Sequence, residues 1–369
     1  MANPWGKVSA TPDCLSNARN SSATTALSST TLRNVKGILQ HALLVSLGIA
    51  LNMSSPARAS AAPSTTTSST ISGSPVAVAP LTGLPDPRHL TKDRAALTIK
   101  IDNTPQAMPQ AGVQEADVVY EEIVEGGITR LAAIYNSRLP TMVGPVRSVR
   151  RTDREIVFPL GGIFAFSGGA DYALRSIATA PVALYSEANA GAAMFRDPQR
   201  YPPHNLFANA ALLMRRNAKP RPTRALFQYL APGTSAKGPK VRSFVVGFAA
   251  GYAVSYVWNP TTKSWDRSLF GRPDVSANGV QLAPKNVIVM SVNYVGGAGV
   301  LDSYAQLVGS GPVEIFVGGH LERGTWIRHH LAQTTSYVNA SGKSIRLEPG
   351  QTWVELLDHS EHVTVITRP

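Results

Sequence analysis

Residues 115–151 constrain the fold more than any other stretch of this chain. Residues 118–124 are rich in β-branched and aromatic side chains, residues 125–127 (Glu-Gly-Gly) are typical of a turn, and residues 128–135 return to the strand pattern. Two strand-like segments on either side of a short glycine turn predict an antiparallel β-hairpin.

The length of the turn decides which side chains meet across this hairpin. A three-residue loop places Glu122 directly opposite Arg130. A two-residue turn at Gly126-Gly127 would shift the register by one residue and leave Glu122 only diagonal to Arg130. We favour the three-residue loop.

Three arginines follow the hairpin closely, after a Gly-Pro turn at residues 144–145: Arg147, Arg150 and Arg151. A short helix is predicted just beyond them, from Asp153 to Leu160. Positive charges grouped this closely repel one another unless something neutralises them. The arginines therefore predict either an anionic ligand or a structural network in which Glu122, Glu125 and Asp153 neutralise them.

A second cluster of polar residues lies at residues 195–205. Prolines stiffen the approach to His204 and Asn205, and an imidazole beside an amide can present both a donor and an acceptor to a ligand. The alternative is a rigid loop in which Asp197 pairs with a neighbouring arginine and His204 caps a backbone carbonyl. Seven residues form the predicted ligand-binding set: Arg130, Arg147, Arg150, Arg151, Asp197, His204 and Asn205.

The chain before about Pro80 differs in composition from the rest, being rich in Ser, Thr and Ala. Within it, basic residues precede an apolar stretch at residues 38–51, and small residues suited to cleavage follow at residues 57–61. This apolar stretch is shorter than the roughly twenty residues of a transmembrane helix. We expect residues 1–61 to be a signal peptide with a long n-region, residues 62–80 to be a disordered tether, and the protein to be secreted or held at the bacterial cell surface.

The only cysteine, Cys14, precedes the apolar stretch, so the exported chain has neither an internal disulfide nor a lipid-accepting cysteine. Beyond position 61 the chain carries 30 Lys and Arg against 22 Asp and Glu, a net charge of +8. A basic exported protein is attracted to anionic wall polymers, and peripheral contact with anionic lipid headgroups is a further alternative.

Other partner classes are not expected. Nucleic acid is disfavoured because no helix-turn-helix or zinc-finger spacing appears. Neither a metal nor another cofactor is predicted, because the adjacent His329 and His330 would point to opposite faces of a strand and no cysteine ligand is available.

The folded part divides at a basic, proline-rich stretch, which we predict as a linker at residues 216–240 with one short helix at residues 225–230. Residues 81–215 mix strands and helices, whereas residues 241–369 show strand patterns with turns every eight to twelve residues. The predicted fold class is α+β, a mixed sheet with a few helices followed by a smaller β-rich module. Residues 350–356 are predicted as its closing strand.

Several motifs, taken in order, resemble the YerB-like lipoproteins, a bacterial family of unknown function. They are EADVVYEEIVEGGITRLAAIY, VGPVRSVR, PHN at residues 203–205, WNPTTKSWDR, APKNVIVM and LEPGQTWVEL. The resemblance spans residues 81–358 and implies a larger mixed α/β part joined to a smaller β-rich part. It implies no reaction, and the lipid-accepting cysteine that many members carry is absent here.

Three functions remain open. The first is binding of an anionic cell-wall polymer or a peptidoglycan fragment through the predicted set, since guanidinium groups suit phosphate and carboxylate oxygens. The second is hydrolysis of a polysaccharide or phosphodiester, with Glu125 and His204 as candidate catalytic residues. The third is a protein-binding scaffold that uses the edge strands of the β-rich module. The oligomeric state is not predicted.

Overall fold

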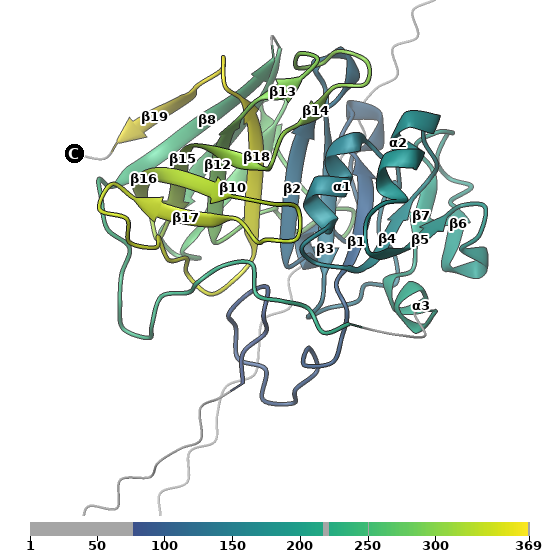
Figure 1. Ribbon diagram of the computed structural model, residues 1–369, viewed down its shortest axis with the longest axis horizontal. Coiled ribbons are helices and arrows are strands. Elements are labelled where there is room, and N and C mark those ends of the chain that lie inside the picture. The colour runs from purple at the N-terminus through teal and green to yellow at the C-terminus, as the bar shows by residue number, and fades with distance from the viewer. Residues whose placement is uncertain (1–76, 217–220, 250, 368–369) are drawn as a thin grey trace, which may run out of the picture. The chain divides into compact units, whose positions relative to one another are not determined.

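The computed structural model describes residues 77–216, 221–249 and 251–367, whose regular structure is mostly strand (Figure 1). The predicted signal peptide and all but the last four residues of the predicted tether lie outside the described residues. Among the described helices, none combines the length and apolar character needed to cross a bilayer.

The largest element is a mixed sheet of ten strands. From edge to edge it contains β17 (Ser336–Asn339), β16 (His320–Arg328), β15 (Gly309–Val317), β12 (Asn286–Val292), β18 (Thr352–Asp358), β2 (Val118–Ile123), β3 (Thr129–Tyr135), β1 (Leu97–Asp102), β4 (Gly162–Phe166) and β5 (Val182–Ser186). Seven of these strands run in the same direction, so their carboxyl ends share one edge: β1, β2, β4, β5, β12, β16 and β18.

A second, antiparallel sheet contains β11 (Arg272–Pro273), β10 (Ser264–Leu269), β9 (Tyr252–Asn259), β8 (Val241–Ala249) and β19 (Val363–Thr367). Two small ribbons pair β13 (Tyr294–Val295) with β14 (Tyr304–Ala305), and β6 (Met194–Arg196) with β7 (Leu206–Ala208). The described α-helices are short: α1 (Arg151–Val157), α2 (Asp171–Ile177) and α3 (Ala210–Arg215). The predicted α+β class with a β-rich carboxyl-terminal part is therefore confirmed.

The predicted hairpin is present as β2 and β3, with Glu125–Gly127 as a short 3-10 turn between them. Glu122 faces Arg130, which confirms the register of a three-residue loop. Gly126 and Gly127 both have positive φ, 79° and 74°, a conformation that glycine adopts at little cost. Both the turn and the pairing therefore match what residues 118–135 predict.

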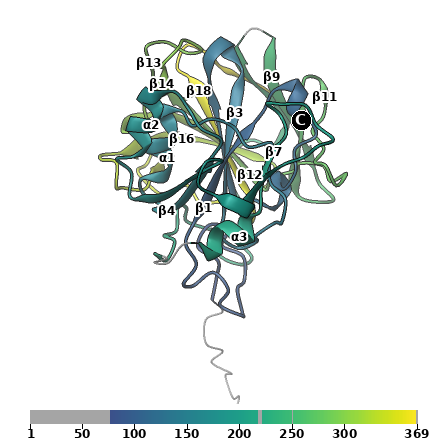
Figure 2. The same cartoon turned by 90° about the vertical axis from the view of Figure 1, so that its right-hand side faces the viewer.

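The two faces of the large sheet are covered by different layers. Glu121 and Glu122 are consecutive in β2, so their side chains point to opposite faces. On one face, Glu122 pairs with Lys100, which also bonds Asp153 of α1. On the other face, Glu121 bonds Arg267 of β10. Figure 2 accordingly shows α1 and α2 on one side of the central strands and β9 and β11 on the other.

Two predictions in the carboxyl-terminal half are wrong. Residues 225–230 do not form a helix; Tyr229 instead makes a β-bridge to Leu347, a tertiary contact that outweighs local helix propensity. The predicted closing strand is β18, which does not end the fold but lies inside the large sheet between β12 and β2, parallel to both.

Candidate functional site

Asp102 organises the site, at the edge where the carboxyl ends of β1 and β2 meet. This residue ends β1 and its side chain is fully buried. Its Oδ2 atom lies 3.0 Å from Nε of Arg147 and 2.7 Å from Nδ1 of His204. The contact with Arg147 is an ion pair without the direction of a hydrogen bond, whereas His204 is hydrogen-bonded. One carboxylate oxygen therefore positions both side chains.

Backbone contacts bring Arg147 to this carboxylate. The N–H of Asp102 donates to the carbonyl of Pro145, and the N–H of Arg147 donates to the carbonyl of Lys100. Gly144 has φ of +149°, and a Cβ there would lie 2.9 Å from the carbonyl oxygen of Leu206. The Gly-Pro turn thus places the backbone of residues 145–147 beside the end of β1.

Arg130 and Arg150 add positive charge beside Arg147. Burial, together with the charges of Arg150 and Arg147, lowers the pKa of Arg130 to about 10. The guanidinium of Arg130 donates to the carbonyl of Ser148 at 3.0 Å, while its Nε is buried without a partner. Arg150 donates to one oxygen of Glu125 from Nε (2.8 Å) and from Nη2 (2.6 Å).

We call these six residues the Asp102 cluster: Asp102, Glu125, Arg130, Arg147, Arg150 and His204. The cluster contains three guanidinium groups and two carboxylates, so positive charge is in excess. Of the acids expected to neutralise the arginines, Glu125 does so, but Glu122 and Asp153 are instead joined to Lys100.

Glu125 is an ionised acceptor in this arrangement. Burial acts to raise its pKa, but hydrogen bonds and charge from Arg150 outweigh burial and hold the pKa below its ordinary value. Its other oxygen faces the hydroxyl of Tyr172 at 3.4 Å. A carboxylate held this way does not carry a proton to donate at neutral pH.

The structure separates three predicted residues from this cluster. Arg151 pairs with Asp302 at 3.2 Å and lies over the ring of Tyr304, 4.2 Å from its centroid. Asn205 accepts from Arg196 at 2.6 Å, and Asp197 accepts from the backbone N–H two residues further on. Asp197 and Asn205 therefore stabilise the loop that carries His204.

Asp102 is the residue that sequence reasoning missed. The sequence pattern predicts a strand at residues 95–101, and Asp102 then begins an Asp-Asn-Thr-Pro sequence typical of a turn. Ligand sites in open sheets with parallel strands lie outside the carboxyl ends of those strands. The sequence does show a polar residue at the end of a buried strand. It does not show the contact with His204, which lies about a hundred residues further along the chain.

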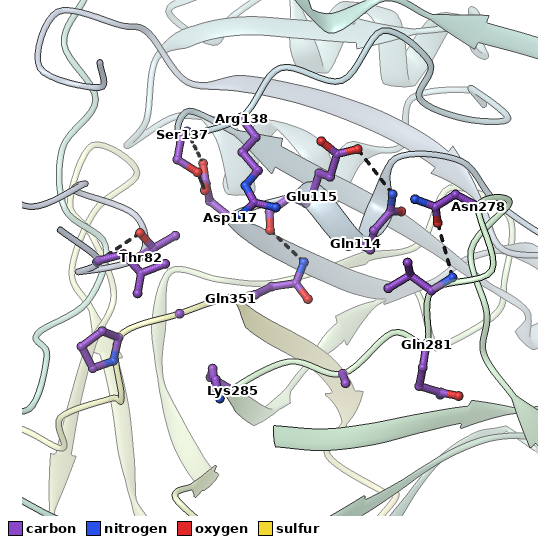
Figure 3. A pocket seen from close by; sticks show the side chains of 16 residues that line it. Thr82, Gln114, Glu115, Asp117, Ser137, Arg138, Asn278, Gln281, Lys285 and Gln351 are labelled. Atoms are coloured by element: carbon purple, nitrogen blue, oxygen red, sulfur yellow. Dashed lines mark hydrogen bonds between the residues drawn. The ribbon is translucent and has the colours of Figure 1, made fainter. Parts of the chain in front are cut away.

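A separate hollow of about 530 Å³ lies at the opposite, amino-terminal ends of β2 and β18 (Figure 3). Its lining includes both charges, with Glu115 and Asp117 against Arg138 and Lys285. Asp117 accepts hydrogen bonds from the backbone N–H groups of Asn136 and Ser137, and from the Ser137 hydroxyl. Because its charges are balanced, this hollow lacks the cationic excess of the Asp102 cluster.

The chain was compared with known families and structures. Models for the N-terminal and C-terminal domains of DUF3048, a protein of unknown function, match residues 81–223 and 244–354. YerB of Bacillus subtilis (strain 168), whose name includes the word lipoprotein, is 25% identical over 300 residues, 76% of this chain and 86% of YerB. The crystal structure of YerB matches with a TM-score of 0.68 at 23% identity, covering 78% of this chain and 99% of YerB. The chain therefore belongs to the DUF3048 family, proteins of unknown function that include YerB.

Proposed function

We propose that this protein binds an anionic component of the bacterial cell envelope at the Asp102 cluster. One observation carries the proposal: a single buried oxygen of Asp102 anchors both Arg147 and His204 by their inner nitrogens. Their outer nitrogens are left for a ligand, because the described residues offer no hydrogen-bond partner to the terminal nitrogens of Arg147 or to Nε2 of His204.

Exposure and charge support the same conclusion. The side chains of Arg147 and His204 are 22% and 19% exposed, so each is held in place yet reached by solvent. Arg130 adds a guanidinium whose pKa is lowered partly by its cationic neighbours, a repulsion that an anion would relieve. A planar guanidinium beside an imidazole suits the oxygens of a phosphate or a carboxylate.

The name of a relative and the composition of the chain both support a location at the cell envelope. The name of YerB includes the word lipoprotein, and lipoproteins face the extracytoplasmic side of a membrane. Residues 38–51 have the apolar core of an export signal, and the chain beyond position 61 is basic. Anionic wall polymers and peptidoglycan fragments are the abundant ligands in that compartment that carry such oxygens.

The test measures binding of poly(glycerol phosphate) and of methyl phosphate by isothermal titration calorimetry. Losing a charge-assisted hydrogen bond costs about 1.5–3 kcal/mol, so Arg147→Ala should bind both probes at least about tenfold more weakly than the wild type. Raising the salt concentration should weaken wild-type binding, because the contacts are partly exposed.

Arg323→Ala is the matched control. Arg323 is 63% exposed and pairs with Glu314 in the β-rich half, so its removal lowers the net charge equally without touching the cluster. An equal loss of affinity in the two variants would show that binding is only non-specific attraction to positive charge. Binding that is unchanged in Arg147→Ala and insensitive to salt would refute the proposal.

A further inference from the structure

A largely apolar cavity of about 600 Å³, within the size range of small-molecule sites, is lined in part by the loop that follows Asp102. Two segments far apart in the sequence line it, the loop after β1 and the turn between β10 and β11. The lining residues are Pro105, Met108, Pro109, Leu269, Phe270, Arg272, Pro273, Asp274 and Val275.

The loop after β1 connects the cavity to the cluster. The hydroxyl of Thr104 lies 3.5 Å from Nδ1 of His204, and the next residue, Pro105, lines the cavity. Arg200, from the loop that carries His204, donates to the carbonyls of Ala107 (3.0 Å) and Pro109 (2.5 Å). The histidine loop and the cavity wall are therefore tied together, because Thr104 contacts His204 and its neighbour Pro105 lines the cavity.

The charges at the cavity favour an anion with an apolar tail. Asp274 is the one acid among the lining residues of this cavity, and it is buried against the guanidinium of Arg267. Because this carboxylate is paired, no free acid of the lining faces a ligand, whereas Arg272 is exposed there. The accessible charge around the cavity is consequently positive, as it is in the cluster.

Phe270 forms part of the wall in an unusual conformation. Its φ is +52° and that of Gly271 is +70°, the left-handed values that the two-residue turn between β10 and β11 adopts. The ring is 37% exposed and meets the ring of Tyr252 edge to face, with 5.1 Å between centroids. The turn and the contact with Tyr252 therefore hold this ring at the cavity wall.

We propose that the ligand is an amphiphilic phosphate, a single lipid molecule whose phosphate binds Arg147 and His204 and whose hydrocarbon chain fills this cavity. The inference rests on the proposed function, because the cluster supplies the headgroup site. It adds the class of ligand: a phosphate that carries an alkyl or isoprenoid chain, rather than a free polymer alone.

The experiment compares decyl phosphate, below its critical micelle concentration, with methyl phosphate and with uncharged decanol. Each buried methylene strengthens binding about fourfold, so wild-type protein should bind decyl phosphate at least about a hundredfold more tightly than methyl phosphate. Phe270→Gly removes the wall and relieves the positive φ, so this variant should fold; Met108→Ala shortens a second wall. Both should lose at least about tenfold in decyl phosphate affinity and bind methyl phosphate as the wild type does.

Val257→Ala, at an apolar side chain 47% exposed on β9 of the same sheet, is the control and should leave both affinities unchanged. Equal wild-type affinity for the two phosphates would overturn the chain site and leave the proposed function intact. Tight decyl phosphate binding that depends on Phe270 but not on Arg147, without methyl phosphate binding, would overturn the headgroup assignment. Unchanged decyl phosphate affinity in both wall variants would also refute the inference.

Discussion

Replacing Arg267 by methionine should strongly destabilise the protein. Arg267 is fully buried between the two sheets, donating to Glu121 at 2.7 Å and to Asp274. Its guanidinium lies 4.4 Å from the ring centroid of Trp353. Burial opposes its charge, but the nearby carboxylate of Glu121 outweighs burial and raises the pKa of Arg267 above its ordinary value. The group is therefore always charged.

The magnitude follows from the charges left behind. Burial and the charge of Glu121 raise the pKa of Glu355 well above its ordinary value, which favours its neutral form. The network then holds one positive charge against Glu121 and Asp274. Methionine keeps the contact with Trp353 but leaves two buried carboxylates without a cation, which costs about 3–5 kcal/mol.

Urea unfolding followed by tryptophan fluorescence measures the loss, because Trp353 and Trp265 are both buried near the network. The loss should be smaller at pH 5 than at pH 8, since the stranded carboxylates can then take up protons. The triple variant Arg267→Met, Glu121→Gln, Asp274→Asn should recover most of the stability. As a control, Arg323→Met breaks an exposed pair with Glu314 and should cost about 1 kcal/mol or less. A loss below about 1 kcal/mol in Arg267→Met, or no recovery in the triple variant, would refute the reasoning.

Two further predictions concern a buried carboxylate and a crowded glycine. Burial raises the pKa of Asp153 to about 6, so the folded state holds a proton that the unfolded state has released, and stability should fall as pH rises from about 4 to about 6 by at most ~1.4 kcal/mol per unit. Urea titrations across this range should show a shallower decline for Asp153→Asn; an identical slope would contradict the assignment. Gly162→Ala would place a Cβ 2.2 Å from the carbonyl oxygen of Ala96 at φ +84° and should cost about 3 kcal/mol or more in thermal unfolding. Gly342→Ala, with φ +75° and open space, should cost only about 1 kcal/mol, and equal losses would show that the clash is unimportant.

Features that depend on residues close together in the sequence were predicted correctly. The β2–β3 hairpin was predicted with its register because the turn and both strands lie in one short segment. The arginines after Gly144-Pro145 were predicted to gather, and Arg147 and Arg150 do so around Arg130. Arg151 does not, because the first turn of α1 directs it toward Asp302.

Contacts between segments far apart in the chain could not be predicted from the sequence. Asp102 acquires its role only when His204, a hundred residues along the chain, folds onto it, and the apolar cavity exists only where the loop at residues 105–109 meets the β10–β11 turn. Residues 225–230 carry a helical pattern but bridge to Leu347 instead. Neither periodicity nor composition records such pairings.

The central position of β18 affects how the protein must be made. A nascent chain completes β2 at Ile123, long before Thr352–Asp358 leaves the ribosome or an export channel. Until then the β2 edge has unpaired backbone groups that can template pairing with another chain. We therefore expect truncations that end before β18 to aggregate, and successful expression to require either the whole chain or a chaperone that shields this edge.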